Sequence, residues 1–279
     1  MKKLFILFFA LILCSINLVL ANDKEEINFP KRQAISYFQD EEGVYVFKIQ
    51  TAKLKEEVKP FVSDGLMTTQ QVYDDNKFTL VVNGGFFDGK NKKTVSFVVI
   101  NGETAADPNN NENLIGNKYL EPYMEKILNR SELRIYDFQG YSVYDITPHS
   151  EPVPINCTLK HSLQAGPMLV PQLRLEEEFF ILKDENGKII SESASALHRF
   201  ARTAVGIKDN NVYIFIATDK APKNLEEMAE LAKKYKMEKA LALDGGGSTS
   251  IDFENLHIIT KTSDTVETGR KVKSFLIIP

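Results

Sequence analysis

Three consecutive glycines follow an acid in the stretch LALDGGGSTS, residues 241–250. Glycine loses more backbone entropy on folding than any other residue, so three in a row indicate that another group approaches the main chain closely. Successive glycine N–H groups can converge on an anion, and the hydroxyls of Ser248 and Thr249 add two further donors. The stretch therefore predicts a phosphate-binding loop formed by Gly245, Gly246, Gly247 and Ser248, with Asp244 beside it.

The same stretch has other interpretations. It is not a nucleotide P-loop, because no lysine follows the glycines. It is not a nucleophile elbow either, because GGSTS lacks the closing glycine of G-x-S-x-G. A tight hairpin between LALD and SIDF is an alternative, since Asp-Gly is a strong turn signal. A serine hydrolase would have to pair Ser248 with a distant histidine, an arrangement that no local signature supports.

A second glycine-rich turn occurs in NGGFFD, residues 83–88, where a predicted strand ends at Asn83 and two glycines follow. Phe86 and Phe87 predict an apolar wall beside a polar pocket, which is a common feature of ligand sites. The alternative is a plain turn whose two rings enter the core.

Two further motifs contribute candidate binding residues. In AGPML, Gly166 permits a close approach of the backbone and Pro167 fixes φ, which is typical of a tight corner. In RTAVG, Arg202 and Thr203 begin a predicted strand. A guanidinium at that position can hold a phosphate or carboxylate with two parallel hydrogen bonds. An isolated arginine is more often a surface residue.

Residues 1–21 have the pattern of a secretory signal peptide, because two lysines precede an apolar run that ends in the small-residue pattern VLA. About 17 apolar residues are at the lower limit for a membrane span, and Cys14 lacks the small residue expected before a lipidated cysteine. No later stretch is apolar enough to span. We therefore expect an exported protein, periplasmic or secreted, in which Cys157 is the only cysteine of the mature chain.

The composition excludes several classes of protein. The chain of 279 residues has a formal net charge of −4, and 43% of its side chains are apolar, as in ordinary globular proteins. An acidic balance without a basic face argues against a nucleic-acid partner. The four histidines lack metal-ligand spacing, and DGGGS does not match a calcium-binding EF-hand loop. We therefore predict no cofactor.

Runs of β-branched and aromatic residues predict a strand-dominated protein. Residues 225–235 predict one clear helix with an apolar face, and Asn224 is its expected N-cap. The asparagine-rich stretch 106–117 predicts a loop or an insertion. The predicted strands cover residues 43–49, 78–84, 94–100, 132–138, 203–207, 211–217, 239–244 and 273–279.

A strand, a helix and a second strand follow one another over residues 211–244, which predicts a parallel, right-handed crossover. Asp219 and Asp244 follow the two strands, so we expect both at the edge of the sheet where ligands usually bind. The fold class is therefore α+β, with a mixed, strand-dominated sheet and this crossover near the C-terminus. No compositional change marks a linker, so residues 22–279 predict a single domain.

Taken in order, the motifs resemble the phosphodiester glycosidase family, which includes the lysosomal uncovering enzyme. The resemblance covers about residues 43–279. Two positions depart from it: Ala201 stands where many relatives have a proline, and Asp219-Lys220-Ala221 stands where they have a DGR-like triplet. The matching motifs are NGGFFD, SFVVINGE, AGPMLV, RTAVGI, IATDK with the helix after it, LALDGGGSTS and VKSFLIIP.

The resemblance implies a glycosidase that hydrolyses a small-molecule or glycan sugar-1-phosphodiester. Such cleavage needs a grip on the phosphate, stabilisation of an oxocarbenium-like sugar and a carboxylate. We expect Asp244, Asp219 and Arg202 to be catalytic, with Asp244 preferred as the group that activates water or attacks the anomeric carbon. Loop capping is the alternative role of both acids. The expected substrate-binding residues are Asn83, Gly84, Gly85, Phe86, Phe87, Gly166, Pro167, Thr203, Gly245, Gly246, Gly247 and Ser248.

A non-catalytic module that binds envelope glycans or phosphodiesters is the alternative function, because the same loop would hold the anion without turnover. Release of sugar from a sugar-1-phosphate methyl diester, lost in Asp244→Asn, would indicate the enzyme. Labelling of Ser248 by a fluorophosphonate would instead indicate a serine hydrolase.

Overall fold

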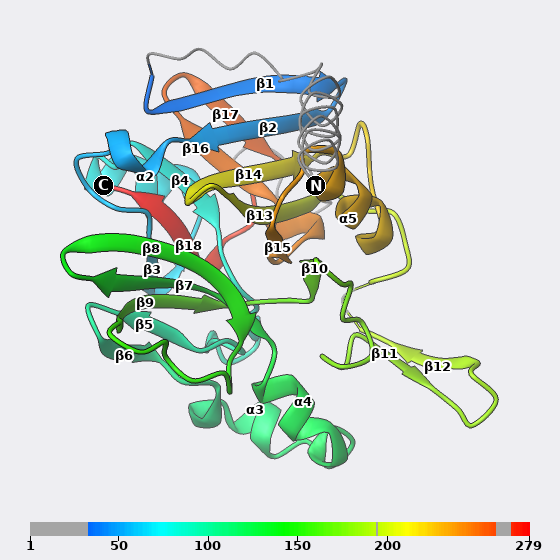
Figure 1. The fold of residues 1–279 in the computed structure, drawn as a ribbon. Helices are drawn as coiled ribbons and strands as arrows, with labels where there is room; N and C mark the ends of the chain where they lie inside the picture. Colours follow the sequence, from blue (N-terminus) through cyan, green and yellow to red (C-terminus); the bar gives the residue numbers. More distant parts are fainter. Residues whose placement is uncertain (1–32, 194, 261–268) are drawn as a thin grey trace, which may run out of the picture. The chain divides into compact units, whose positions relative to one another are not determined.

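The computed structural model describes residues 33–193, 195–260 and 269–279, which are mostly strand (Figure 1). Strand makes up 43% of the structure and helix 16%, so the predicted strand-dominated α+β class is confirmed. The predicted signal peptide, residues 1–21, lies outside the described residues. Within the described ranges, no helix is both long and apolar enough to cross a membrane.

The strands form three large sheets and one small hairpin. In the order of neighbours, the first sheet contains β1 (Ile35–Glu41), β2 (Val44–Ile49), β14 (Asn211–Ala217), β13 (Arg202–Lys208), β15 (Lys239–Ala242) and β10 (Met168–Val170). The second sheet contains β17 (Leu256–Ile259), β16 (Ser250–Phe253), β4 (Leu80–Asn83), β18 (Val272–Ile278) and β3 (Lys59–Met67). The third contains β6 (Glu103–Ala106), β5 (Val98–Ile100), β9 (Thr158–Gln164), β7 (Ser131–Phe138) and β8 (Tyr141–Pro148). The hairpin pairs β11 (Ile181–Lys183) with β12 (Ile189–Glu192).

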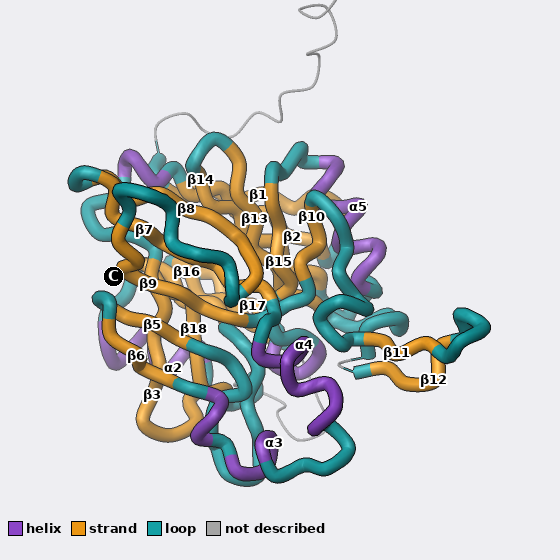
Figure 2. The backbone as a smooth tube through the Cα atoms, turned by 60° about the horizontal axis from the view of Figure 1, so that its bottom comes forward, coloured by secondary structure: helices purple, strands orange, loops and turns teal. Residues whose placement is uncertain are grey.

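The helices are short and lie outside the sheets. The hairpin β11–β12 and the helices α3 and α4 extend away from the sheets in Figure 2. The α-helices are α2 (Thr69–Asn76), α3 (Glu112–Ile115), α4 (Met124–Leu128) and α5 (Leu225–Lys234). The 3-10 turns are η1 (Thr51–Lys53), η2 (Pro108–Asn110), η3 (Glu121–Tyr123) and η4 (Gly246–Ser248).

The predicted crossover is present in the first sheet. Strands β14 and β15 both pair antiparallel with β13, so they run parallel to each other on its two sides. Helix α5 connects them and begins at the predicted N-cap, where Asn224 and Glu227 form a capping box. The parallel arrangement is therefore confirmed, with β13 inserted between the two strands.

The central strands β13, β14 and β15 of the first sheet are buried on both faces, which explains their continuous apolar runs. Ile214 of β14 belongs to a core cluster that also includes Leu276 of the second sheet and Leu133 of the third. Phe215, the next residue, points to the other face and packs on Tyr235 at the end of α5, with ring centroids 5.7 Å apart. One core therefore joins all three sheets, and α5 covers the outer face of the first.

Each of the eight predicted strands is present, although the one expected at 94–100 is limited to β5. The stretch 106–117, expected to be a loop or an insertion, contains η2 and α3. The alternative interpretation of LALDGGGSTS as a hairpin is wrong, because β15 and β16 belong to different sheets. The glycine-rich stretch instead carries the chain from the first sheet to the second.

Candidate active site

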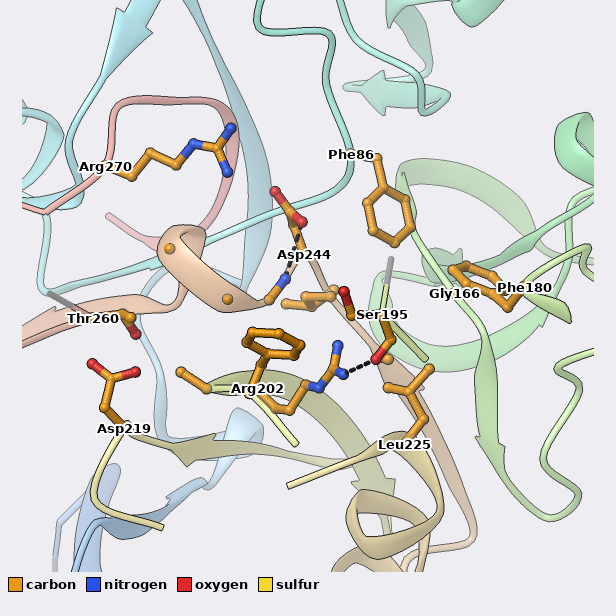
Figure 3. Close-up of a pocket in the computed structure, with 17 residues that line it drawn as sticks. Phe86, Gly166, Phe180, Ser195, Arg202, Asp219, Leu225, Asp244, Thr260 and Arg270 are labelled. Carbon is orange, nitrogen blue, oxygen red and sulfur yellow. Dashed lines mark hydrogen bonds between the residues drawn. The ribbon is translucent and has the colours of Figure 1, made fainter. Parts of the chain in front are cut away.

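Strand register brings the three predicted catalytic residues to one edge of the first sheet. Arg202 at the start of β13 pairs with Ala217 at the end of β14, two residues before Asp219. Ala204 pairs with Ala242, two residues before Asp244. The middle strand thus begins where its two neighbours end, and the side chains of Arg202, Asp219 and Asp244 line one cavity of about 490 Å³ (Figure 3).

The cavity combines residues predicted from sequence with others that were not. Asp244 lies in the middle of Figure 3, with Arg270, Thr260 and Asp219 on one side and Phe86, Phe180 and Leu225 on the other. The cavity therefore has a charged side and an apolar side. The predicted residues that line it are Phe86, Gly166, Arg202, Asp219, Asp244, Gly245, Gly246 and Gly247. The predicted residues that do not are Asn83, Gly84, Gly85, Phe87, Pro167, Thr203 and Ser248.

Asn83 is completely buried behind the cavity and binds protein groups. Its Nδ2 donates to the main-chain oxygen of Asp244 (2.6 Å). Its Oδ1 accepts from the hydroxyl of Thr203 (2.7 Å) and from the N–H of Ser250 (3.2 Å). The Asn83 side chain therefore links β4 to β13, to β16 and to the loop that carries Asp244. Its amide donor and acceptor, which were expected to bind substrate, are thus bonded to groups of the protein.

The two glycines after Asn83 are required by close packing of the chain on itself. A Cβ on Gly84 would lie 2.8 Å from the main chain of Ser274, and a Cβ on Gly85 would lie 2.3 Å from the main-chain oxygen of Gln164. The carbonyl of Gly84 accepts from the N–H of Asp244 (3.0 Å). This turn consequently holds the main chain of Asp244 in place.

The remaining predicted residues outside the cavity wall also have structural contacts. The carbonyl of Pro167 accepts from the N–H of Ala242 (3.0 Å), which holds the corner after β9 against β15. Ser248 lies in η4 and is fully buried. Phe87 packs with apolar residues on the outer face of the second sheet, and its ring lies 5.4 Å from the guanidinium of Arg270.

Most amides of the glycine-rich loop are bonded inside the protein. The N–H of Gly245 donates to the Asp244 carboxylate (3.0 Å), that of Gly246 to the carbonyl of Ala201 (2.8 Å) and that of Ser248 to the carbonyl of Gly245 (3.1 Å). The expected ring of converging donors is therefore not formed by these three groups. Gly246 has a φ of +57°, a left-handed conformation that favours glycine.

Asp244 has the electrostatic setting of a tuned acid–base group. Burial raises the pKa of its carboxyl above the ordinary value, while the Ser248 hydroxyl, Arg270, the Gly245 N–H and Arg202 oppose the rise. A carboxylate with a raised pKa holds a proton more readily, which suits general acid–base work. Such perturbed groups in a cavity are typical of functional sites.

Arg202 contributes its charge from a position where two of its nitrogens are engaged. Nε donates to the carbonyl of Lys223 (3.0 Å), and Nη2 donates to the carbonyls of Ser195 (2.6 Å) and His198 (2.9 Å). Burial lowers the pKa of Arg202, and the negative charge of Asp244 opposes that shift. The guanidinium of Arg202 was expected to bind a phosphate with two parallel hydrogen bonds. It instead donates mainly to main-chain carbonyls.

Arg270 is the cation that sequence reasoning missed. It lines the cavity, its side chain is exposed, and the ring of Phe87 supports its guanidinium. Its only signal in the sequence is its position just before the predicted strand at 273–279. Thr260, Ser195, Phe180, Phe200 and Leu225 were missed as well, because they reach the cavity from loops and from the start of α5.

The four histidines do not support a serine hydrolase. Each ring bonds a carboxylate instead: His149 bonds Glu132, His161 bonds Glu57, His198 bonds Glu192 and His257 bonds Asp252. Within the described part of the chain, no three His, Cys, Asp or Glu side chains are grouped so that they could hold a metal ion.

The fold resembles three solved structures at low sequence identity. The catalytic domain of zebrafish N-acetylglucosamine-1-phosphodiester α-N-acetylglucosaminidase, auto-inhibited by its pro-peptide, is 15% identical with a TM-score of 0.63, and the match covers 89% of this chain and 84% of that one. A putative exported protein from Burkholderia pseudomallei K96243 is 14% identical with a TM-score of 0.63, over 85% of this chain and 74% of that one. A hypothetical protein from Synechocystis is 14% identical with a TM-score of 0.57, over 92% of this chain but only 64% of that one, less than two thirds of its length.

The sequence itself matches a family model. No curated protein sequence matches the chain closely enough to count as a relative. The model described as phosphodiester glycosidase matches residues 76–278, from the end of α2 to the end of β18, and so includes all the segments that line the cavity. The predicted resemblance is therefore confirmed, and the chain belongs to the phosphodiester glycosidase family.

Proposed function

We propose that the protein hydrolyses the glycosidic bond of a sugar-1-phosphodiester and releases a free sugar and a phosphomonoester. The observation that carries the proposal is the Asp244 carboxylate, half-buried in a cavity that Arg202 and Arg270 also line, in a chain of this family. The name of the zebrafish relative states that it acts on an N-acetylglucosamine-1-phosphodiester, which supports the same class of substrate.

Asp244 acts as the general base in this proposal. The carboxylate takes a proton from a water molecule, the water oxygen bonds to the anomeric carbon, and the bond from that carbon to the phosphate oxygen breaks. The electron pair leaves with the phosphate. A phosphate is a good leaving group, so one carboxylate suffices without strong general-acid help.

The cationic side of the cavity stabilises the leaving group. A phosphodiester carries one negative charge, and a second develops on the leaving oxygen as the bond breaks. Arg270 is exposed and supported by Phe87, so it is placed to bind the phosphate oxygens, while Arg202, which also lines the cavity, adds positive potential. Preorganised cations and donors of this kind are worth a few kcal/mol each, about 3 kcal/mol for one well-placed group. Asp219 at the rim accepts hydrogen bonds from sugar hydroxyls.

The proposed compartment is outside the cytoplasm, in the periplasm or the medium. The signal-peptide pattern of residues 1–21 supports it. The structural relative from Burkholderia pseudomallei is also described as a putative exported protein.

The test compares Asp244→Asn and Asp219→Asn with the wild type on methyl diesters of sugar-1-phosphates. We expect Asp244→Asn to lose at least about a thousandfold in kcat and Asp219→Asn to lose less, mainly through KM, because only Asp244 transfers a proton. Asp244→Asn should be at least as stable as the wild type at neutral pH, because burial disfavours the charged form that it removes.

Two outcomes contradict this mechanism. Binding of the diesters without release of sugar, across a panel of sugars, would indicate the non-catalytic module. Direct attack by water inverts the configuration at the anomeric carbon, which NMR of freshly released sugar records. Retention would assign Asp244 the role of nucleophile instead.

A further inference from the structure

We propose that Phe200 is the surface on which the sugar ring of the substrate rests, an inference that depends on the proposed function. Phe200 lines the cavity, and 46% of it is exposed. The other aromatic rings of the cavity are packed against each other. Phe180 is only 1% exposed, and its ring centroid lies 5.8 Å from that of Phe86. Phe200 is therefore the cavity phenylalanine with the most surface left for a ligand.

The main chain around Phe200 is held in place. Its N–H donates to the carbonyl of Lys223 (3.2 Å), and the N–H of Lys223 donates back to the carbonyl of Phe200 (2.9 Å). The guanidinium of Arg202 lies 6.0 Å from the ring centroid and donates to the same Lys223 carbonyl. A residue with a fixed main chain and only two side-chain torsions loses little entropy when it binds a ligand.

The chemistry of a sugar matches a cavity in which an exposed aromatic ring, Phe200, occurs together with polar side chains. A pyranose ring has C–H groups on its faces and hydroxyls around its edge, so an aromatic ring can cover the C–H groups and exclude water from them. The polar side chains of Asp219 and Thr260 line the same cavity and would meet the hydroxyls, while Arg270 meets the phosphate. An apolar aglycone would use the same aromatic surface, so the test must separate the two groups.

Binding is measured by calorimetry in the Asp244→Asn background, where the ligand is not consumed. The probe is the methyl diester of N-acetylglucosamine-1-phosphate, whose aglycone is a single methyl group. We expect Phe200→Ala to weaken its Kd about tenfold, or about 1.4 kcal/mol, which corresponds to about 55 Å² of apolar surface. Phe200→Tyr keeps the ring and should keep the affinity. Phe138→Ala is the matched control, because Phe138 is 38% exposed and ends β7 outside the cavity.

Two simpler probes assign the effect to the sugar. Dimethyl phosphate has no sugar, so its Kd should be the same in Phe200→Ala and its parent. If Phe200→Ala weakens phenyl methyl phosphate more than the sugar diester, the surface binds an apolar aglycone and the proposal is overturned. An unchanged Kd for the sugar diester overturns it as well.

Turnover separates this inference from the proposed function. With Asp244 intact, Phe200→Ala should raise KM about tenfold and leave kcat unchanged, because the ring contacts substrate and transition state equally. An equal loss in kcat would overturn the proposed role. Absence of turnover in the wild type would contradict the hydrolase proposal, while the calorimetric comparison would still report on Phe200.

Discussion

The two arginines of the cavity have different roles at the level of single residues. Arg202 stands in a recognisable motif, and the sequence placed it at the site, but Nε and Nη2 hold main-chain carbonyls. Arg270 lies in no such motif, yet its exposed guanidinium reaches the cavity. A local sequence motif can therefore indicate that an arginine lies near a site. It does not indicate which groups the guanidinium bonds, because those groups come from other segments of the chain.

Replacing Arg270 should change the pH dependence of activity. Burial raises the pKa of Asp244, and Arg270 opposes that rise. Without this positive charge the pKa rises further, so the base form of Asp244 is lost at a higher pH as the solution is acidified. We expect the acidic limb of kcat/KM in Arg270→Ala to move to higher pH, with a KM at least about tenfold higher for the phosphodiester.

The adjacent residue provides the control for this experiment. Lys271 is also exposed and cationic but does not line the cavity. Lys271→Ala should therefore leave both the pH profile and KM unchanged. An acidic limb that stays in place in Arg270→Ala would show that Arg270 does not act on Asp244.

At the level of elements, one buried amide sets the distance between strands of two sheets. Asn83 at the end of β4 bonds the main chain of Asp244, the hydroxyl of Thr203 in β13 and the N–H of Ser250 in β16. These three partners come from both the first and the second sheet. We therefore expect Asn83 to position the carboxylate proposed as catalytic.

Asn83→Ala should lose both stability and activity. It leaves buried polar groups without partners, each costing about 1–3 kcal/mol, so we expect a fall of about 2–4 kcal/mol in the free energy of unfolding. The fall is measured by urea denaturation. The fraction that remains folded should show a lower kcat with little change in KM, since Asn83 does not line the cavity. Asn76→Ala, at the exposed end of α2, is the matched control and should lose little. A normal kcat in Asn83→Ala would limit Asn83 to a purely structural role.

Strand β9 shows one physical reason why a strand escaped prediction from the sequence. Strand β9, TLKHSLQ, contains His161, Ser162 and Gln164, all buried. Gln164 bonds the carbonyls of Leu128 and Arg130, and His161 bonds Glu57. Buried polar residues break the alternation of apolar and polar residues, so the run resembles a loop. By contrast β14, whose two faces meet apolar neighbours, was predicted with its observed bounds.

At the level of the whole molecule, the three sheets share one core, which predicts a single cooperative unfolding transition. Phe47 of β2 is fully buried and contacts Phe253 of β16 edge to face, with ring centroids 6.2 Å apart. Phe47→Ala should lower the free energy of unfolding by about 3–5 kcal/mol. Circular dichroism and activity should be lost together along the denaturation curve.

A second aromatic substitution tests the specificity of that effect. Phe138→Ala at the exposed end of β7 should change stability by no more than about 0.5 kcal/mol. If activity in Phe47→Ala disappears well before the circular dichroism signal, the sheets unfold separately and the shared core does not couple them.

The position of β18 has a consequence for biosynthesis. This strand, Val272–Ile278, is inserted between β4 and β3, two strands made much earlier by the ribosome. A nascent chain that has emerged as far as β17 therefore still has a gap in the middle of its second sheet. The second sheet, which contributes Asn83 from β4, can therefore close only after β18 has been synthesised.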